Sequence, residues 1–209
     1  MYNSENRIKI LTSAESLFRK YGTRSISMDD IAHELNMSKK TIYKSFADKN
    51  EIVYQVIAAF KKQLEGLVEA IIDKPANPVH QLVRIFICLT SMVRETNPSL
   101  IYDLQKYHEN VWLILQGFRD DFLVSKVKAV LLDGIRKQYF SPTLDVNFYA
   151  TFFLAAVQLS GNEKLFPPAK YSQQALTINL LDCLLVGIGT KKGSRAYEKH
   201  KLNALQSLD

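Results

Sequence analysis

The sequence predicts an all-α protein of about nine helices. Apolar residues recur three and four positions apart along most of the chain, which is the spacing of one helix face. The 209 residues include only eight glycines and six prolines, and the prolines fall at the ends of the periodic segments or between them. No stretch shows the strict alternation of a β-strand. With 47% hydrophobic and 23% charged residues, the chain has the composition of a folded globular protein.

Composition also limits the class of protein. The net charge of +6 and the pI of 9.2 allow an anionic partner such as nucleic acid. Cys88 and Cys183 are far apart on apolar stretches, so the sequence shows neither a disulfide framework nor metal-ligand spacing. The apolar stretches 148–159 and 176–188 are too short or too interrupted to span a bilayer, and the N-terminus shows no apolar signal segment. We expect a cytoplasmic protein without metal, cofactor or membrane association.

The first two expected helices have clear start and stop signals. Residues 5–21 place apolar side chains on one stripe, and Gly22 ends this helix because glycine tolerates positive φ. Ser27 can cap the next helix by accepting the backbone N–H of Asp30, whose carboxylate also favours a helix N-terminus. Asn36 follows, and asparagine tolerates the left-handed backbone of a tight turn.

A third, short helix and a fourth, long helix follow this turn. Ser38 can cap the third helix, and Ile42 and Phe46, four residues apart, give it one inward face. A D-x-x-E sequence at residues 48–51 marks the start of the fourth helix, which extends for roughly 24 residues on its apolar periodicity. The two prolines of KPANP, residues 74–78, end it.

The rest of the chain keeps a helical pattern interrupted by prolines. We expect five further helices, over residues 79–94, 98–115, 118–138, 145–159 and 172–188. Residues 191–201 hold five Lys or Arg and one Glu, and we expect a solvated, frayed terminus there. The chain shows no internal repeat and no low-complexity segment.

The second and third expected helices have the spacing of a helix-turn-helix. In such a pair the second helix lies in the major groove of DNA, with its first residues at the base edges. Acidic residues are absent between residues 35 and 47, although they are frequent on either side. The side chains left facing outward are Lys39, Lys40, Thr41, Tyr43 and Lys44. The lysines can neutralise phosphates, while the hydroxyl groups can form hydrogen bonds with phosphates or bases.

Flanking residues extend this expected DNA-binding surface. The helix N-terminus at Ser38 directs backbone N–H groups toward the same anion. Lys49 can reach the flanking DNA backbone, and Ser27 and Thr23 are candidates for phosphate contact on the other side. The competing interpretation is a lysine-rich helix that is merely solvated. The missing acidic residues and the capped helix-turn-helix spacing argue against it.

Three motifs within residues 8–52 carry a resemblance to a known family. They are Ile10-Leu11…Ala14…Leu17-Phe18…Gly22, then Ser27-Met28-Asp29-Asp30-Ile31-Ala32, then Ser38-Lys39-Lys40-Thr41-Ile42-Tyr43 with Phe46 and Lys49. This pattern resembles the TetR family of bacterial transcriptional repressors. The matching DNA-contact positions are Ser27, Ser38, Lys39, Thr41, Tyr43, Lys44 and Lys49.

The resemblance implies an organisation and a function. It implies a homodimer with a three-helix DNA-binding domain, residues 1–50, and a larger helical domain for effector binding and dimerisation, residues 51–209. It also implies a ligand-responsive repressor that binds a palindromic operator and is released by a small effector. The chain departs from the family pattern at Ile26, Asn36, Lys40 and Ser45. Because relatives usually have a small residue in place of Lys40, we expect a different operator preference.

The expected effector pocket lies on residues 86–92, 101–112 and 118–122. Within it, the segment IYDLQKYHENVW mixes rings with hydrogen-bonding groups, as ligand sites do. The candidate pocket residues are Phe86, Tyr102, Gln105, His108, Trp112 and Phe122. The abundant rings suggest a hydrophobic or aromatic effector. An amphipathic helix with a buried tryptophan and an exposed polar side is the competing interpretation, and the pattern alone favours it.

The last two expected helices are candidates for the dimer interface. Residues 148–159 and 176–189 are apolar on more than one face, so both helices should be buried. Burial against a second copy, through helices at about 145–160 and 172–189, would give a four-helix interface. Burial within the subunit alone is the alternative.

Other classes of protein fit the sequence less well. For an enzyme, the four histidines show no metal-ligand spacing, and H-E-x-x-H, G-x-S-x-G, Walker and G-x-G-x-x-G motifs are absent. Asp103 and His108 are five residues apart, which is a poor spacing for one helix face, and His33 is expected to be exposed. A recombinase arm or sigma-like factor would lack the long helical C-terminal part. A membrane-surface helix would need a wider apolar face than Ile42 and Phe46 provide.

Overall fold

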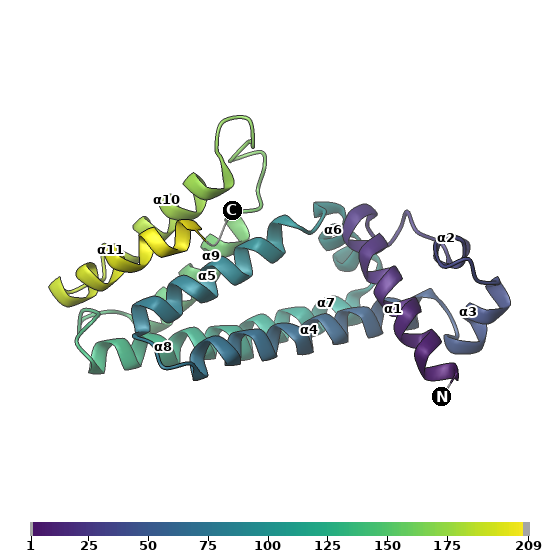
Figure 1. Cartoon of the computed structure of the whole chain (residues 1–209), viewed down its shortest axis with the longest axis horizontal. Coiled ribbons are helices and arrows are strands. Elements are labelled where there is room, and N and C mark those ends of the chain that lie inside the picture. The colour runs from purple at the N-terminus through teal and green to yellow at the C-terminus, as the bar shows by residue number, and fades with distance from the viewer. Residues whose placement is uncertain (1, 207–209) are drawn as a thin grey trace. The chain divides into compact units, whose positions relative to one another are not determined.

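The computed structural model describes residues 2–206 and confirms the all-α fold class (Figure 1). Its helices are α1 (Tyr2–Tyr21), α2 (Met28–Glu34), α3 (Lys39–Ser45), α4 (Lys49–Asp73), α5 (Pro78–Arg94), α6 (Pro98–Tyr107), α7 (Glu109–Gly117), α8 (Val124–Arg136), α9 (Val146–Leu159), α10 (Gln173–Leu185) and α11 (Lys191–Gln206). A short π-helical segment, η1 (Phe118–Leu123), precedes α8. Within residues 2–206 the β-type pairing is limited to one isolated bridge, between Phe140 and Gly189.

Two differences account for eleven α-helices where about nine were expected. The helix expected over residues 98–115 is two helices, because His108 leaves the helical conformation with φ −136° and ψ 56°. The second addition is α11, which occupies the basic tail. The expectation of a frayed terminus there is wrong.

The helix α11 is docked rather than frayed because its inner side chains are buried and paired. It packs against α5 and α10. Tyr197 is 2% exposed, and its hydroxyl donates to Asp182 Oδ1 at 2.7 Å. Burial, and then this hydrogen bond, raises the pKa of Tyr197. Lys201 Nζ lies 2.7 Å from each carboxylate oxygen of Asp182. A carboxylate on α10 therefore holds two residues of α11.

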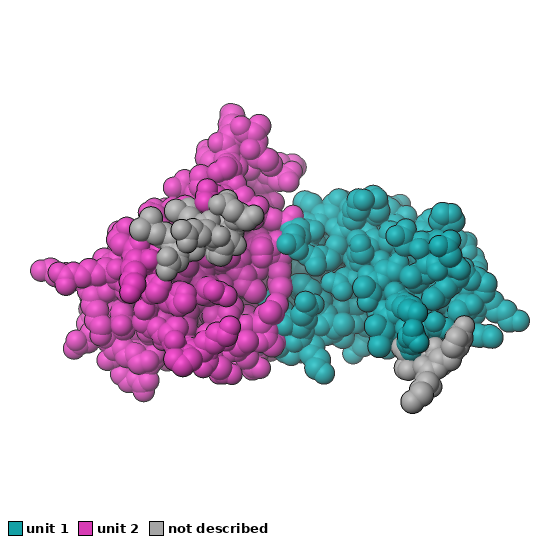
Figure 2. All heavy atoms as spheres, in the orientation of Figure 1, with its two compact units in different colours: residues 1–65, 95–118 teal, residues 66–94, 119–209 magenta. Residues whose placement is uncertain are grey.

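The chain forms two compact units, coloured separately in Figure 2. Unit 1 comprises Met1–Glu65 and Glu95–Phe118, and unit 2 comprises Gly66–Arg94 and Arg119–Asp209. The helix α4 contributes its first part to unit 1 and its last part to unit 2. The functional boundary at residue 50 stays a prediction, because compactness and function need not divide a chain at the same residue.

Unit 1 has one hydrophobic core to which all its helices contribute. The helix α1 packs against α2, α3 and α6. Ile42 and Phe46, the inward residues predicted for the third helix, are buried in this core. Its buried members from α4, α6 and α7 are Ile52, Val53, Val56, Ile57, Leu100, Leu104 and Val111. The inner face of α3 therefore rests on the same core as α4 and α7.

The short helices of unit 1 begin and end as the sequence predicts. Gly22 ends α1 with φ 79°, and Asn36 forms the turn between α2 and α3 with φ 51°. Ser27 and Asp30 form a capping box, in which the Asp30 N–H donates to Ser27 Oγ at 3.2 Å and the Ser27 N–H donates to Asp30 Oδ2 at 2.7 Å. These bonds satisfy N–H groups that a helix start leaves free.

Unit 2 is built around α5, which packs against α8, α9, α10 and α11. Phe86 of α5 is buried and meets Phe153 of α9 edge-on, with ring centroids 5.4 Å apart. His80 of α5 stacks on His200 of α11, with ring centroids 4.3 Å apart and an angle of 16° between the planes. Burial lowers the pKa of both histidines, and nearby cationic side chains lower it further.

Candidate nucleic-acid interface

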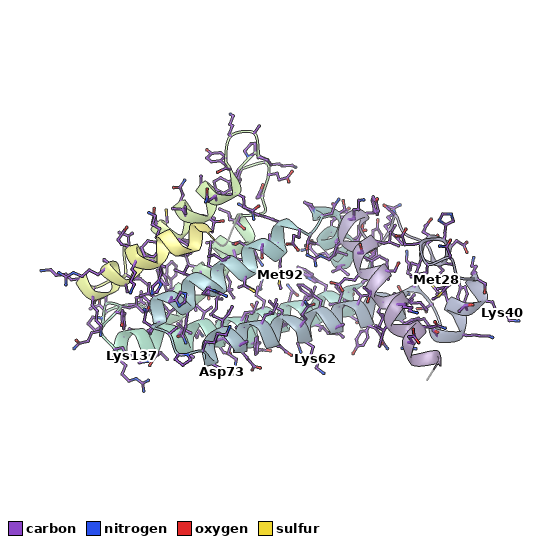
Figure 3. All side chains as sticks on the ribbon, in the orientation of Figure 1. Met28, Lys40, Lys62, Asp73, Met92 and Lys137 are labelled. Carbon is purple, nitrogen blue, oxygen red and sulfur yellow. The ribbon has the colours of Figure 1, made fainter. Side chains whose placement is uncertain are left out.

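The helix α3 presents the polar face that the sequence predicts. Its apolar residue Ile42 is buried, while Lys40, Tyr43 and Lys44 are exposed. Figure 3 shows Lys40 pointing away from the ribbon. The sequence of α3, KKTIYKS, contains no acidic residue, so this exposed face is positively charged. Such a face can contact phosphates and base edges.

Lys39 already has an anionic neighbour within the protein. Its Nζ lies 2.8 Å from Asp29 Oδ2 of α2, and this hydrogen bond raises the pKa of Lys39. Both side chains are more than half exposed, so the ion pair is weak. A DNA phosphate can therefore take the place of Asp29.

The hydroxyl groups at the starts of α2 and α3 serve as helix caps. Ser38 Oγ accepts the Thr41 N–H at 3.1 Å, and the two hydroxyl oxygens lie 2.8 Å apart. Ser27 Oγ donates to Asp30 Oδ2 at 2.6 Å, and this bond lowers the pKa of Asp30. Both serines remain exposed, so a phosphate would meet hydroxyl groups that already have a fixed position.

Thr23 and Lys49 take part in the internal structure of the turn between α1 and α2. Thr23 is fully buried, so the expectation that it contacts a phosphate is wrong. Lys49 Nζ donates to the carbonyl oxygens of Thr23 and Ile26, both at 3.1 Å. Two of the three ammonium hydrogens are thus used within the protein. The predicted DNA contact of Lys49 would use the remaining one.

Sequence reasoning missed a polar cluster beneath the same turn, formed by Thr23, Arg24, Asp103 and His108. The buried Asp103 of α6 accepts the Arg24 N–H at 2.8 Å and the Thr23 hydroxyl at 3.5 Å. His108 Nε2 lies 3.2 Å from Thr23 Oγ1, and burial, followed by the nearby Lys49, lowers the pKa of His108. Arg24 and Asp103 are 79 residues apart, so no local pattern could indicate this polar cluster.

Arg7 is another positioning residue that sequence reasoning missed. Its guanidinium carbon lies 4.2 Å from the centroid of the Phe46 ring. The same group donates to the backbone carbonyl of Ser45 and lies 3.2 Å from Glu51 Oε1. Arg7 therefore ties α1 to the end of α3 and to the first turn of α4.

Comparison with known proteins agrees with this geometry. Residues 10–56 match a family model described as bacterial regulatory proteins, tetR family. The transcriptional repressor KstR2 of Mycobacterium tuberculosis is 24% identical over 156 residues, which cover 71% of this chain and 76% of that protein. The helix-turn-helix region of the chain therefore belongs to the tetR family. The solved structure of KstR2 is similar to the structure of this chain, with a TM-score of 0.67 and 22% identity, over 89% of this chain and 96% of that chain.

Two further proteins are similar to this chain, one in sequence and one in structure. The uncharacterised HTH-type regulator YvaF of Bacillus subtilis is 28% identical over 111 residues. The match covers 53% of this chain and 58% of YvaF, so it spans little more than half of that protein. The structure of AibR, in complex with isovaleryl coenzyme A and operator DNA, has a TM-score of 0.65 and 17% identity, over 85% of this chain and 97% of that chain.

The proteins that this chain matches indicate its functional class. It is a helix-turn-helix transcriptional regulator, and the expectation that it is not an enzyme is confirmed by the regulators it matches. Among the described residues, no helix combines the length and apolar character needed to cross a membrane. In that same part of the chain, no group of three or more His, Cys, Asp or Glu is placed to hold a metal ion.

The six predicted pocket residues are divided between the two units. Phe86 and Phe122 belong to unit 2, and Phe86 is part of its core. In unit 1, Tyr102 and Gln105 are exposed, while His108 and Trp112 are partly buried. Trp112 packs against the unit 1 core. That these six residues form one effector pocket stays a prediction.

Unit 1 also contains a cavity of about 300 Å³ between α4 and α7. The lining residues are Tyr54, Ile57, Ala58, Lys61, Lys62, Glu65, Val111 and Ile114. None of the six predicted pocket residues is among them. Periodicity could not indicate this cavity, because its two walls come from helices that are distant in the sequence.

Proposed function

We propose that this protein represses transcription by binding a palindromic operator as a homodimer, and that a small hydrophobic or aromatic effector releases it. The observation that carries the proposal is the basic exposed face of α3 on a capped helix-turn-helix within the tetR-family match. KstR2, which is named a repressor, and AibR, whose structure contains operator DNA, support this function. DNA as the partner places the protein in the cytoplasm.

The proposed DNA surface comprises Ser27, Ser38, Lys39, Lys40, Thr41, Tyr43, Lys44 and Lys49. The exposed Lys40, Tyr43 and Lys44 are free to reach base edges and phosphates. The capping hydroxyl groups and Lys39 would bind phosphates and so fix the position of α3 on the duplex. Lysine pairs well with the acceptors of guanine in the major groove, so Lys40 favours a guanine-containing half-site.

The proposed homodimer uses α9 and α10. The helix α9 exposes Phe148 (65%), Phe152 (43%) and Leu159 (43%), whose spacing places them on one helix face. The rings of Phe148 and Phe152 stack with centroids 5.9 Å apart. Val186, which directly follows the last residue of α10, is 57% exposed. Such exposed apolar residues mark protein interaction sites, and a twofold axis would let the same helices of two copies cover each other.

The proposed effector would act by binding one arrangement of the dimer better than the other. The two α3 helices must lie about 34–36 Å apart to enter successive major grooves. The helix α4 follows the helix-turn-helix directly, so a change at α4 would alter that separation. AibR, crystallised with an acyl coenzyme A and DNA, provides a precedent for a relative that holds both kinds of ligand.

Selection of bound sequences from a random DNA pool tests the proposed function. We expect a palindrome whose half-sites are about one helical turn apart. Enrichment of a sequence without twofold symmetry would contradict the homodimer. Enrichment of no sequence at all would contradict operator binding.

A further inference from the structure

We propose that the cavity between α4 and α7 binds a small amphipathic monocarboxylate. This inference rests on the proposed function, because it identifies the chemical class of the effector and where it binds. At about 300 Å³ the cavity is within the range of small-molecule sites. All its lining residues belong to unit 1, which also contains the helix-turn-helix.

The shape of the cavity suits an elongated ligand. Its α4 wall is one helix face, because each lining residue has another three or four positions away. These residues are Tyr54, Ile57, Ala58, Lys61, Lys62 and Glu65. From Tyr54 to Glu65 this wall extends about 16 Å along the helix axis. Val111 and Ile114 of α7 form the opposite wall.

The chemistry of the lining favours a carboxylate attached to an apolar chain. Ile57, Val111 and Ile114 provide apolar surface at which a hydrocarbon chain can leave water. The lining contains two lysines and one glutamate, and Lys61 Nζ lies 3.3 Å from Glu65 Oε1.

Lys62 is the cation available to the ligand. It is exposed and, among the residues that the structure describes, has no ion-pair partner. Figure 3 shows its side chain extending away from the α4 ribbon. We therefore assign Lys62 as the residue that pairs with the ligand carboxylate.

The position of this cavity connects it to the DNA-binding surface. Ile57 and Val111, which line the cavity, belong to the same buried core as Ile42 and Phe46 on the inner face of α3. Protein cores are close-packed, so a ligand that displaces Ile57 or Val111 also displaces core residues on which α3 rests. Occupation of the cavity should therefore weaken operator binding.

Calorimetric titration of the full-length protein with hexanoate, octanoate and decanoate tests the site. Alcohols and amines of the same chain lengths are the charge controls. We expect the carboxylates to bind and the amines not to bind. Trp112, the sole tryptophan, follows Val111 directly, so its fluorescence provides a second measurement of binding. Binding of no carboxylate, or equal binding of carboxylates and amines, would overturn the proposal.

A matched pair of substitutions locates the ligand. Ala58 and Ala59 are adjacent, exposed residues of α4, but only Ala58 is part of the cavity lining. We expect Ala58→Phe to fill the cavity and abolish carboxylate binding, and Ala59→Phe to bind like the unmodified protein. Lys62→Gln should weaken carboxylate binding about twofold to fivefold, as expected for an exposed ion pair, and leave alcohol binding unchanged. Equal affinities of the two phenylalanine variants would overturn the assignment.

Operator binding, measured with and without the carboxylate, separates this inference from the proposed function. A protein that binds its selected operator but none of the carboxylates refutes the inference and leaves the repressor function intact. A protein that binds no operator refutes the proposed function, while the calorimetry still decides whether the cavity binds carboxylates. Carboxylate binding that leaves operator affinity unchanged would overturn the role of the cavity as the effector site.

Discussion

The two units differ in the kind of residue that their exposed helices present. In unit 1, α3 buries Ile42 and exposes Lys40, Tyr43 and Lys44. In unit 2, α9 has no charged residue and exposes Phe148 and Phe152. A charged, hydrogen-bonding face suits a polyanion, whereas an apolar face suits a second protein surface. The isolated chain therefore already presents a separate face for each of the two proposed partners, DNA and a second copy.

The units also differ in how their helices are held in place. Short helices such as α2 and α3 are marginal in isolation and depend on tertiary contacts. In unit 1 those contacts include charged groups bound to backbone atoms, as with Lys49 and Asp103. In unit 2 the longer helices pack through rings, such as Phe86 and Phe153. Substitutions in the two units should therefore have different consequences.

The largest expected effect is loss of the dimer on replacing Phe148 and Phe152 by glutamate. Each exposed ring that a partner covers contributes about 1.5–3 kcal/mol, and two copies contribute two rings each. We expect the dimer dissociation constant to rise at least about 1000-fold, measured by analytical ultracentrifugation. Operator binding should fall with it, because one half-site binds weakly alone.

A matched control is Leu132→Glu, which replaces another exposed apolar residue on α8, outside the proposed interface. It should leave the protein dimeric. If the Phe148 and Phe152 variant also stays dimeric, the surface of unit 2 has a different partner.

The next effect concerns the face of α3. Lys44→Ala and Tyr43→Ala should each weaken operator binding by about 1–3 kcal/mol, or roughly tenfold to a hundredfold, in gel-shift titrations, while the dimer stays intact. Lys170→Ala, at an exposed lysine in unit 2, is the control and should bind like the unmodified protein. Unchanged affinity in both α3 variants would refute the assignment of α3 as the recognition helix.

A smaller effect is expected inside unit 1, at Asp103. Asp103→Ala leaves the Arg24 N–H without its acceptor. Because this bond is only partly buried, the loss should cost about 1 kcal/mol of the free energy of unfolding in urea titrations. Asp103→Asn keeps an acceptor oxygen and should lose less. If the two variants lose equal stability, the hydrogen bond to Arg24 is not what Asp103 contributes.

The smallest expected effect is a pH dependence of unit 2. The pKa values of His80 and His200 are lowered in the folded state, chiefly by burial, with Arg84, Lys199 and the other imidazole adding to the shift. Folding therefore favours the neutral rings. Their contribution to stability is complete above the unfolded pKa of about 6.5 and is lost as the pH falls through the lower folded values.

Thermal melts at pH 7 and pH 5 measure this dependence. The unmodified protein should lose more stability between these pH values than the double variant His80→Phe, His200→Phe. His33→Gln, at an exposed position of α2, should behave like the unmodified protein. Equal losses in the double variant would show that the stacked pair does not titrate in this range.

Much of unit 1 could be predicted because its signals are local. Gly22, Ser27 and Asn36 each act within four residues of their own position, and the structure places them as expected. The inward pair Ile42 and Phe46 follows from helix periodicity alone. The family resemblance rested on these same local features, and the match over residues 10–56 confirms it.

What could not be predicted depends on residues that are distant in the sequence. The local sequence predicts that Thr23 is exposed, but Asp103 and His108, both distant in the sequence, lie beside it. From its composition the basic tail is predicted to be solvated. Composition does not indicate that Tyr197 and Lys201 contact Asp182. The cavity between α4 and α7 has the same origin, since neither wall alone suggests a binding site.

The polar cluster beneath the α1–α2 turn has a consequence for chimeric regulators. Besides the bond from Arg24 to Asp103, Asn97 Nδ2 donates to the Lys20 carbonyl at 2.9 Å. A chimera that exchanged only residues 1–50 between two relatives would contain this turn without Asn97 and Asp103, which form hydrogen bonds with it. Operator specificity should therefore transfer cleanly only when residues 95–108 are grafted together with the DNA-binding helices.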